Sequence, residues 1–126
     1  GEGFNREDLM FRRYLSFLKI ASEDFSDIVV NVELHADRVR LILNDSSWID
    51  VRYPMEDKFS FHWQRGNKIY RIDTAPHHKS IRTFPRHIHF GSEDNVIEDY
   101  VLEENVSPEE NFKRFMDWVR GLLRRN

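Results

Sequence analysis

Hydrophobic residues recur at helical spacing near the start of the chain. Asn5 precedes this segment as a suitable N-cap, and Glu7 and Asp8 place negative charge in the first turn, where it suits the helix dipole. The pattern predicts an amphipathic helix over residues 6–22. Its apolar stripe consists of Met10, Tyr14, Phe17, Leu18 and Ala21.

A second helical pattern lies near the end of the chain. Ser107, Pro108, Glu109 and Glu110 form a capping box with proline at the first helical position. We therefore expect a closing helix over residues 108–124. The apolar positions that follow at helical spacing are Phe112, Phe115, Met116, Val119, Leu122 and Leu123.

Between these segments the apolar residues alternate with polar ones, which is typical of strands that bury one face. Turn residues separate the strands: Ala36-Asp37, the NDSS stretch at 44–47, Pro54, and the Gly-Asn turn within 65–68. The positions expected on the buried face are Ile28, Val30, Val32 and Leu34, then Val39, Leu41 and Leu43, then Ile49, Val51 and Tyr53, then Phe59, Phe61 and Trp63, and finally Tyr70 and Ile72.

A long loop and a short strand complete the middle of the chain. The loop over 74–86 contains two prolines and is too long for a simple turn, so we expect it to cross or cover an edge of the sheet. In the strand 87–90, Ile88 and Phe90 share one face and the two histidines share the other. The stretch 92–105 is compatible with strand or with an approach to the last helix.

These elements predict a single α+β domain over residues 4–126. We expect an antiparallel meander sheet of about five to seven strands, with the N- and C-terminal helices packed on one face. A chain of 126 residues suits one domain, and its 40% apolar content supplies a core. Residues 1–3 are interpreted as the remnant of an expression tag.

Composition excludes several classes of protein. The chain has no cysteine, so a disulfide framework, a thiolate metal site and a cysteine nucleophile are excluded. It contains neither an apolar run of about 18 residues nor a signal-peptide pattern. We therefore expect a cytoplasmic protein that does not contact a membrane.

Charge is distributed unevenly along the chain. Six basic residues and a single acid, Asp73, lie between Arg65 and Arg86, whereas eight acids and no lysine or arginine lie between Glu93 and Glu110. The first stretch favours an anionic ligand, and the second could dock a basic partner. Solvated surface charge is the simpler interpretation of both stretches.

Four of the six histidines lie in the basic stretch or directly after it, within "APHHK" and "TFPRHIHFG". Histidine can act as acid or base near neutral pH, and cleavage of RNA through the 2′-hydroxyl needs one of each. The candidate catalytic residues are His77, His78, His87, His89 and Asp73, with Asp73 orienting an imidazole. Candidate phosphate contacts are Arg71, Lys79, Arg82 and Arg86.

The same residues permit two other interpretations. His77, His87 and His89, completed by Asp73, could hold zinc or a related divalent metal. Alternatively, the prolines stiffen a loop and the histidines only satisfy backbone groups at a sheet edge. His35 and His62 are best explained as surface or satisfied polar residues.

The stretch "YRIDTAPHHKSIRTFPRHIHFG", residues 70–91, resembles the signature of the TumE-type toxin family. The matching features are the strand ending in Asp73, the Pro76-His77-His78 group, Phe84-Pro85, and the HxH strand closed by Gly91. The resemblance implies the toxin half of a prokaryotic toxin–antitoxin pair, restrained by an antitoxin that is usually a DNA-binding helix-turn-helix protein.

Three hypotheses follow from the residues and the resemblance together. In the first, the protein is a ribonuclease-like toxin that needs no cofactor and uses the histidine cluster on RNA. In the second, it is a non-catalytic module that acts through partner contacts. In the third, it is a hydrolase that depends on a divalent metal such as zinc.

Overall fold

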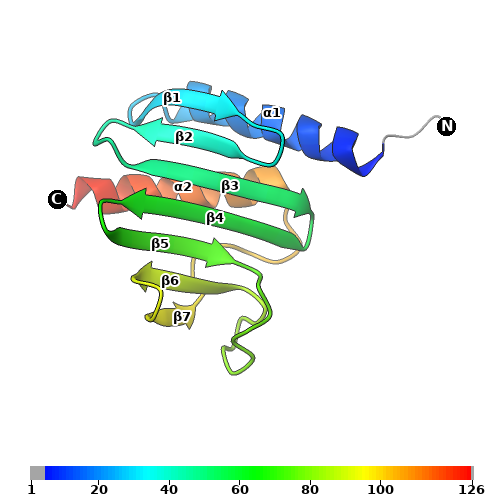
Figure 1. Cartoon of the computed structure of the whole chain (residues 1–126), viewed down its shortest axis with the longest axis vertical. Coiled ribbons are helices and arrows are strands. Elements are labelled where there is room, and N and C mark those ends of the chain that lie inside the picture. The colour runs from blue at the N-terminus through cyan, green and yellow to red at the C-terminus, as the bar shows by residue number, and fades with distance from the viewer. Residues whose placement is uncertain (1–4, 126) are drawn as a thin grey trace.

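The computed structural model describes residues 5–125, and the tag interpretation of residues 1–3 lies outside this range. Seven strands form one antiparallel sheet in sequence order, and two helices lie on one face of it (Figure 1). The predicted α+β fold is confirmed. The elements are α1 (Arg6–Asp24), β1 (Val29–Leu34), β2 (Val39–Leu43), β3 (Trp48–Met55), β4 (Lys58–Arg65), β5 (Lys68–Asp73), β6 (His87–Gly91), β7 (Val96–Glu98) and α2 (Pro108–Arg124).

Both helices begin where the sequence predicts. The side chain of Asn5 accepts a hydrogen bond from the backbone N–H of Asp8 at 2.9 Å, and Ser107 accepts one from Glu110 at 3.1 Å. These side chains satisfy N–H groups that have no partner inside the helix. Neither helix is long and apolar enough to cross a membrane, within residues 5–125.

The core lies between the helices and the inner face of the sheet. Phe112 of α2 stacks on Phe17 of α1 with ring centroids 4.7 Å apart, and Phe115 stacks on Phe61 of β4 at 4.9 Å. The expected aromatic stripe of β4, Phe59, Phe61 and Trp63, is buried here. Its alternation places Ser60, His62 and Gln64 on the outer face, away from the helices.

Two details of the strands differ from the predicted pattern. The side chains of Val30 and Leu34 were expected to be buried, but they are 64% and 37% exposed. The pairing of β1 with β2 shifts between Val29 and Asn31, so Val30 is the extra, unpaired residue of a bulge. Leu34 pairs with the buried Val39 and keeps the predicted face, but it ends an edge strand that has only one neighbour. In addition, β3 continues through Pro54, with an irregular register between Arg52 and Met55.

Candidate functional site

The pairing of β5 with β6 determines where the histidines of β6 point. Ile72 pairs with Ile88, and both are fully buried in the core. Because neighbouring residues in a strand face opposite sides, the adjacent pairs Asp73–His87 and Arg71–His89 lie on the outer face. The predicted strand around the HxH motif therefore brings both histidines next to the end of β5.

The loop over 74–86 covers this part of the outer face and contributes a third imidazole. The ring centroid of His78 lies 4.7 Å from that of His87 and 5.7 Å from that of His89. The loop is held by Thr83, whose hydroxyl donates to the carbonyl of Arg86 at 2.7 Å and accepts from the N–H of Asp99 at 2.9 Å. Of the two adjacent loop histidines, it is thus His78 that approaches the pair.

His77 occupies a different environment from its neighbour. It is exposed, and it does not belong to the group of three histidines whose ring nitrogens approach one another among residues 5–125. The metal-ligand set expected from the sequence, which used His77 with His87 and His89, is therefore corrected to His78 with His87 and His89. We call these three histidines together with Asp73 the three-histidine pocket.

Hydrogen bonds to the backbone fix the orientation of both histidines of β6. The Nδ1 of His87 lies 2.9 Å from the carbonyl oxygen of Pro85, and the Nδ1 of His89 lies 2.9 Å from the carbonyl oxygen of Glu93. A carbonyl only accepts hydrogen bonds, so each Nδ1 carries the hydrogen. In the neutral rings, the lone pairs are therefore on the two Nε2 atoms.

These two Nε2 atoms face each other at 3.1 Å. Two lone pairs at that distance repel, and the contact becomes a hydrogen bond only when one Nε2 also carries a hydrogen. His87 is 1% exposed and His89 is 6% exposed, so little water is available to separate them. A proton or a metal ion between the two Nε2 atoms would remove this repulsion.

Asp73 provides the negative charge beside that position. Its carboxylate lies 3.1 Å from the Nε2 of His87, accepts from the Nε of Arg71 at 2.9 Å and accepts from the N–H of Ala75 at 2.9 Å. The residue is 7% exposed. Buried carboxylates persist where charged and hydrogen-bonded partners surround them, as they do here.

Glu93 is a member of the site that sequence reasoning missed. Its two carboxylate oxygens each accept a hydrogen bond of 2.7 Å from the guanidinium of Arg71, and these bonds lower the pKa of Glu93 and raise that of Arg71. Glu93 is twenty residues beyond Asp73, so only the turn after β6 brings them together. The same guanidinium lies 3.3 Å from the Nδ1 of His62, which stacks on Trp48.

The predicted phosphate contacts are mostly occupied by carboxylates of the chain itself. Arg71 binds Asp73 and Glu93, Arg82 binds Glu98, and Arg86 binds Asp99 at 3.1 Å. Basic and acidic stretches that are separate in sequence thus lie next to each other and pair. Within residues 5–125, Lys79 is exposed and forms no ion pair, so it is the expected phosphate contact that no carboxylate of this chain occupies.

Asp99 organises the chain that follows β7. Its carboxylate accepts from the N–H groups of Val101 and Leu102 at 2.9 and 3.0 Å, and Arg86 pairs with it. Burial nevertheless raises the pKa of Asp99 above its ordinary value. Arg86 is therefore bound to a structural carboxylate, and its side chain is 13% exposed.

The pocket can also hold a metal ion by the chemistry of its donors. One ring nitrogen from each of His78, His87 and His89 lies within 4.8 Å of the other two. Three imidazoles with a nearby carboxylate form a donor set typical of zinc and related transition metals. The structure thus brings together four residues of the predicted site.

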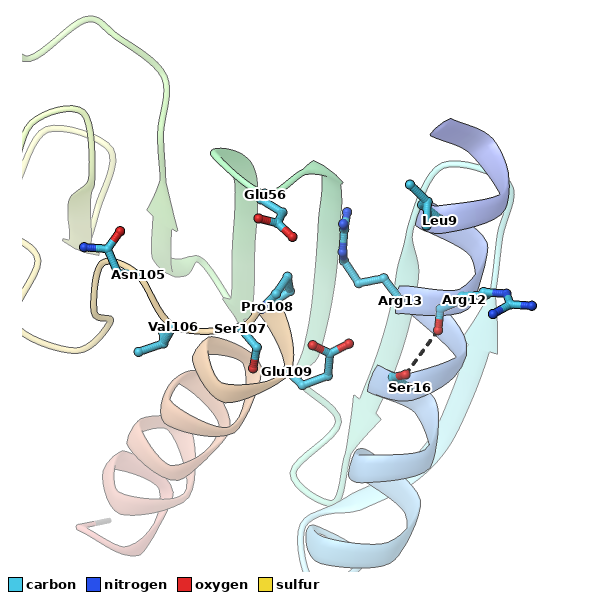
Figure 2. A pocket seen from close by; sticks show the side chains of 10 residues that line it. All are labelled: Leu9, Arg12, Arg13, Ser16, Glu56, Asn105, Val106, Ser107, Pro108 and Glu109. Carbon is cyan, nitrogen blue, oxygen red and sulfur yellow. Dashed lines mark hydrogen bonds between the residues drawn. The ribbon is translucent and has the colours of Figure 1, made fainter. Parts of the chain in front are cut away.

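A separate hollow of about 660 Å³ lies between α1, the β3–β4 turn and the start of α2 (Figure 2). Arg12, Arg13, Glu56 and Glu109 line it with both signs of charge, and its only hydrogen bond drawn runs from Ser16 to the carbonyl of Arg12. None of the predicted site residues lines this hollow. His87 and His89 lie instead on the outer face of the sheet, away from the helices.

Comparison with known proteins identified a family. The family model described as "Toxin TumE" matches residues 17–123, which include every strand, α2 up to Leu123 and the three-histidine pocket. Neither a search of curated proteins nor a search of solved structures found a match.

Proposed function

Because this chain belongs to the TumE toxin family, and so to the toxins of toxin–antitoxin pairs, we propose that its three-histidine pocket cleaves RNA without a metal ion. The observation that supports this proposal is the 3.1 Å contact between the Nε2 atoms of His87 and His89. A pair that shares one proton supplies both an acid and a base. RNA cleavage through the 2′-hydroxyl requires both.

In this proposal His78 is the catalytic base, and the His87–His89 pair is a proton relay that acts as the acid on the leaving oxygen. His78 lies on the covering loop and is less buried than the pair. His78 takes the proton of the 2′-hydroxyl, whose oxygen attacks the phosphorus. The bond to the 5′-oxygen breaks, and that oxygen receives a proton from the His87–His89 pair. Lys79, next to His78, offsets the negative charge that develops on the phosphate.

The relay histidines are positioned by groups that do not touch the substrate. Backbone carbonyls orient both rings, and Asp73 stabilises the positive charge when His87 is protonated. Arg71 in turn holds Asp73 and Glu93. Asp73 and Arg71 are therefore positioning residues in this mechanism.

Cleavage of RNA by the purified full chain in EDTA tests the proposal. We expect the wild type to cleave RNA. The rate of cleavage by His78→Ala should be at least about 100-fold lower, because one acid–base group is lost. His77→Ala is the matched control, since it removes the adjacent, exposed imidazole, and it should retain activity. Absence of cleavage by the wild type between pH 5 and pH 8 would refute the proposal, and so would cleavage that needs added metal.

The antitoxin that pairs with this toxin is proposed to be a helix-turn-helix protein with a basic surface. Among the acids of the stretch 93–110, Glu103 and Glu104 are exposed, and Glu104 lies 3.9 Å from Arg86. Glu93, Glu98 and Asp99 form closer ion pairs with arginines of this chain. Charge reversal at Glu103 and Glu104 should weaken binding of the antitoxin by at least about tenfold if the two surfaces are complementary. Reversal at Asp117, which is exposed on α2, provides the control.

A further inference from the structure

The three-histidine pocket has the geometry of a metal site. The two Nε2 lone pairs of His87 and His89 converge at 3.1 Å, and a ring nitrogen of His78 completes a group within 4.8 Å. Two oxygens of Asp73 lie 3.1 and 3.8 Å from those Nε2 atoms. Four donors from three separate places in the chain thus surround one position.

The hydrogen bonds at the far side of each ring supply independent support. Histidines that bind a metal typically donate the other ring N–H to a carbonyl or carboxylate, which fixes the tautomer and the ring orientation. His87 and His89 both do so, to the carbonyls of Pro85 and Glu93. The pocket therefore has its ligand lone pairs oriented inward before any ion arrives.

Burial and charge favour a divalent transition metal over magnesium or calcium. The two strand histidines are almost completely buried, and imidazole nitrogen is a ligand for zinc, copper, nickel and cobalt. Magnesium and calcium require several oxygen ligands. In this pocket Asp73 is the carboxylate that lies closest to the histidines, and the carboxylate of Glu93 already binds Arg71.

We infer that His78, His87, His89 and Asp73 bind one zinc ion or a similar divalent transition metal in a tetrahedral site. This inference rests on the geometry of the pocket and not on the proposed cleavage of RNA. The ion would occupy the lone pairs that otherwise share a proton, since metals and protons compete for the same nitrogen atoms.

Titration of the full chain, prepared without a polyhistidine tag, with zinc chloride tests the inference by calorimetry. We expect one zinc per chain, with affinity reduced at least about 100-fold in His89→Ala and in His78→Ala, because loss of a supporting group alone costs 10–100-fold. His77→Ala, with the neighbouring imidazole removed, should bind as tightly as the wild type.

Cobalt(II) provides a second measurement that does not depend on enzymatic activity. The wild type should develop the intense visible absorption of tetrahedral cobalt, and His78→Ala, whose substitution lies in a loop, should not. Failure of the wild type to bind zinc at micromolar concentration would overturn the inference, as would equal loss of binding in His77→Ala and His78→Ala. RNA cleavage in EDTA is a separate measurement, so either proposal can fail without the other.

Discussion

Replacement of Asp73 with asparagine removes one charge from the three-histidine pocket and nearly preserves the shape of the side chain. The carboxylate accepts one bond from the guanidinium of Arg71 and lies beside the Nε2 of His87. Hydrogen bonds to charged groups contribute about 1.5–3 kcal/mol and neutral ones about 0.5–1.5 kcal/mol. The contact with His87 is a hydrogen bond when its Nε2 carries the proton shared with His89, and weakening both bonds then costs about 2 kcal/mol.

A further loss of stability comes from the amide group, which replaces one carboxylate oxygen by NH2. If the asparagine oxygen keeps the bond from Ala75, its NH2 group faces the N–H of Arg71, donor against donor. This adds about 1 kcal/mol, the value of one hydrogen bond that can no longer form. The total loss of stability stays below the roughly 3–5 kcal/mol expected when a buried salt bridge is fully broken, because Arg71 keeps its salt bridge with Glu93.

We thus expect Asp73→Asn to lower the free energy of unfolding by about 2–3 kcal/mol, measured by urea denaturation at pH 7 with circular dichroism. In a thermal scan this corresponds to a decrease in Tm of about 10 °C. Asp37→Asn is the control, because Asp37 also pairs with arginine but its side chain is 63% exposed, and we expect no measurable change in the free energy of unfolding. A variant at Asp73 as stable as the wild type would refute the role given to this carboxylate.

The remaining predictions concern stability around the pocket. Ile88→Ala should lower the free energy of unfolding by about 2–5 kcal/mol in urea, since Ile88 is fully buried, and the same change at its partly buried partner Ile97 should cost less. Glu93→Gln should cost about 0.5–1 kcal/mol at pH 7, because the Glu93 side chain is 60% exposed. Hydrogen bonds from Arg71 lower the folded-state pKa of Glu93 from 4.5, so its stabilisation is present above that value and disappears as the pH falls through the folded-state pKa. Urea denaturation from pH 7 to pH 3 should therefore show wild type and Glu93→Gln converging, and a constant difference would contradict this explanation.

Most of the fold could be predicted from the sequence, because the spacing of apolar residues changes clearly between the helical segments and the strands. The caps at Asn5 and Ser107 and the alternation of β4 each have a local cause, and the structure confirms them. Val30 was misassigned because a bulge in an edge strand leaves no trace in the alternation of residues. The sequence did not decide whether the residues of β7 form a strand, because this short strand gains its stability from pairing with β6 and not from its own sequence.

The site was predictable only in part because its contacts are long-range. Histidines on one face of β6 follow from the strand period, and the approach of Asp73 follows from the pairing of adjacent strands. In contrast, the choice of His78 over His77 depends on the path of the loop over 74–86, and Glu93 reaches Arg71 through the turn after β6. A signal for Glu93 was present in the sequence. This acid lies just beyond the end of β6, and β6 was expected next to β5, which carries Arg71.

The claim that the three-histidine pocket carries the toxic activity is tested most directly by growth after induced expression. Wild-type chain should arrest growth of a host that lacks the antitoxin, whereas His87→Ala/His89→Ala should permit normal growth at an equal level of soluble protein. His78→Ala tests the same claim with a substitution outside the sheet, should the double variant be insoluble. Arrest of growth by these variants as strong as that by the wild type, at matched soluble levels, would contradict the account.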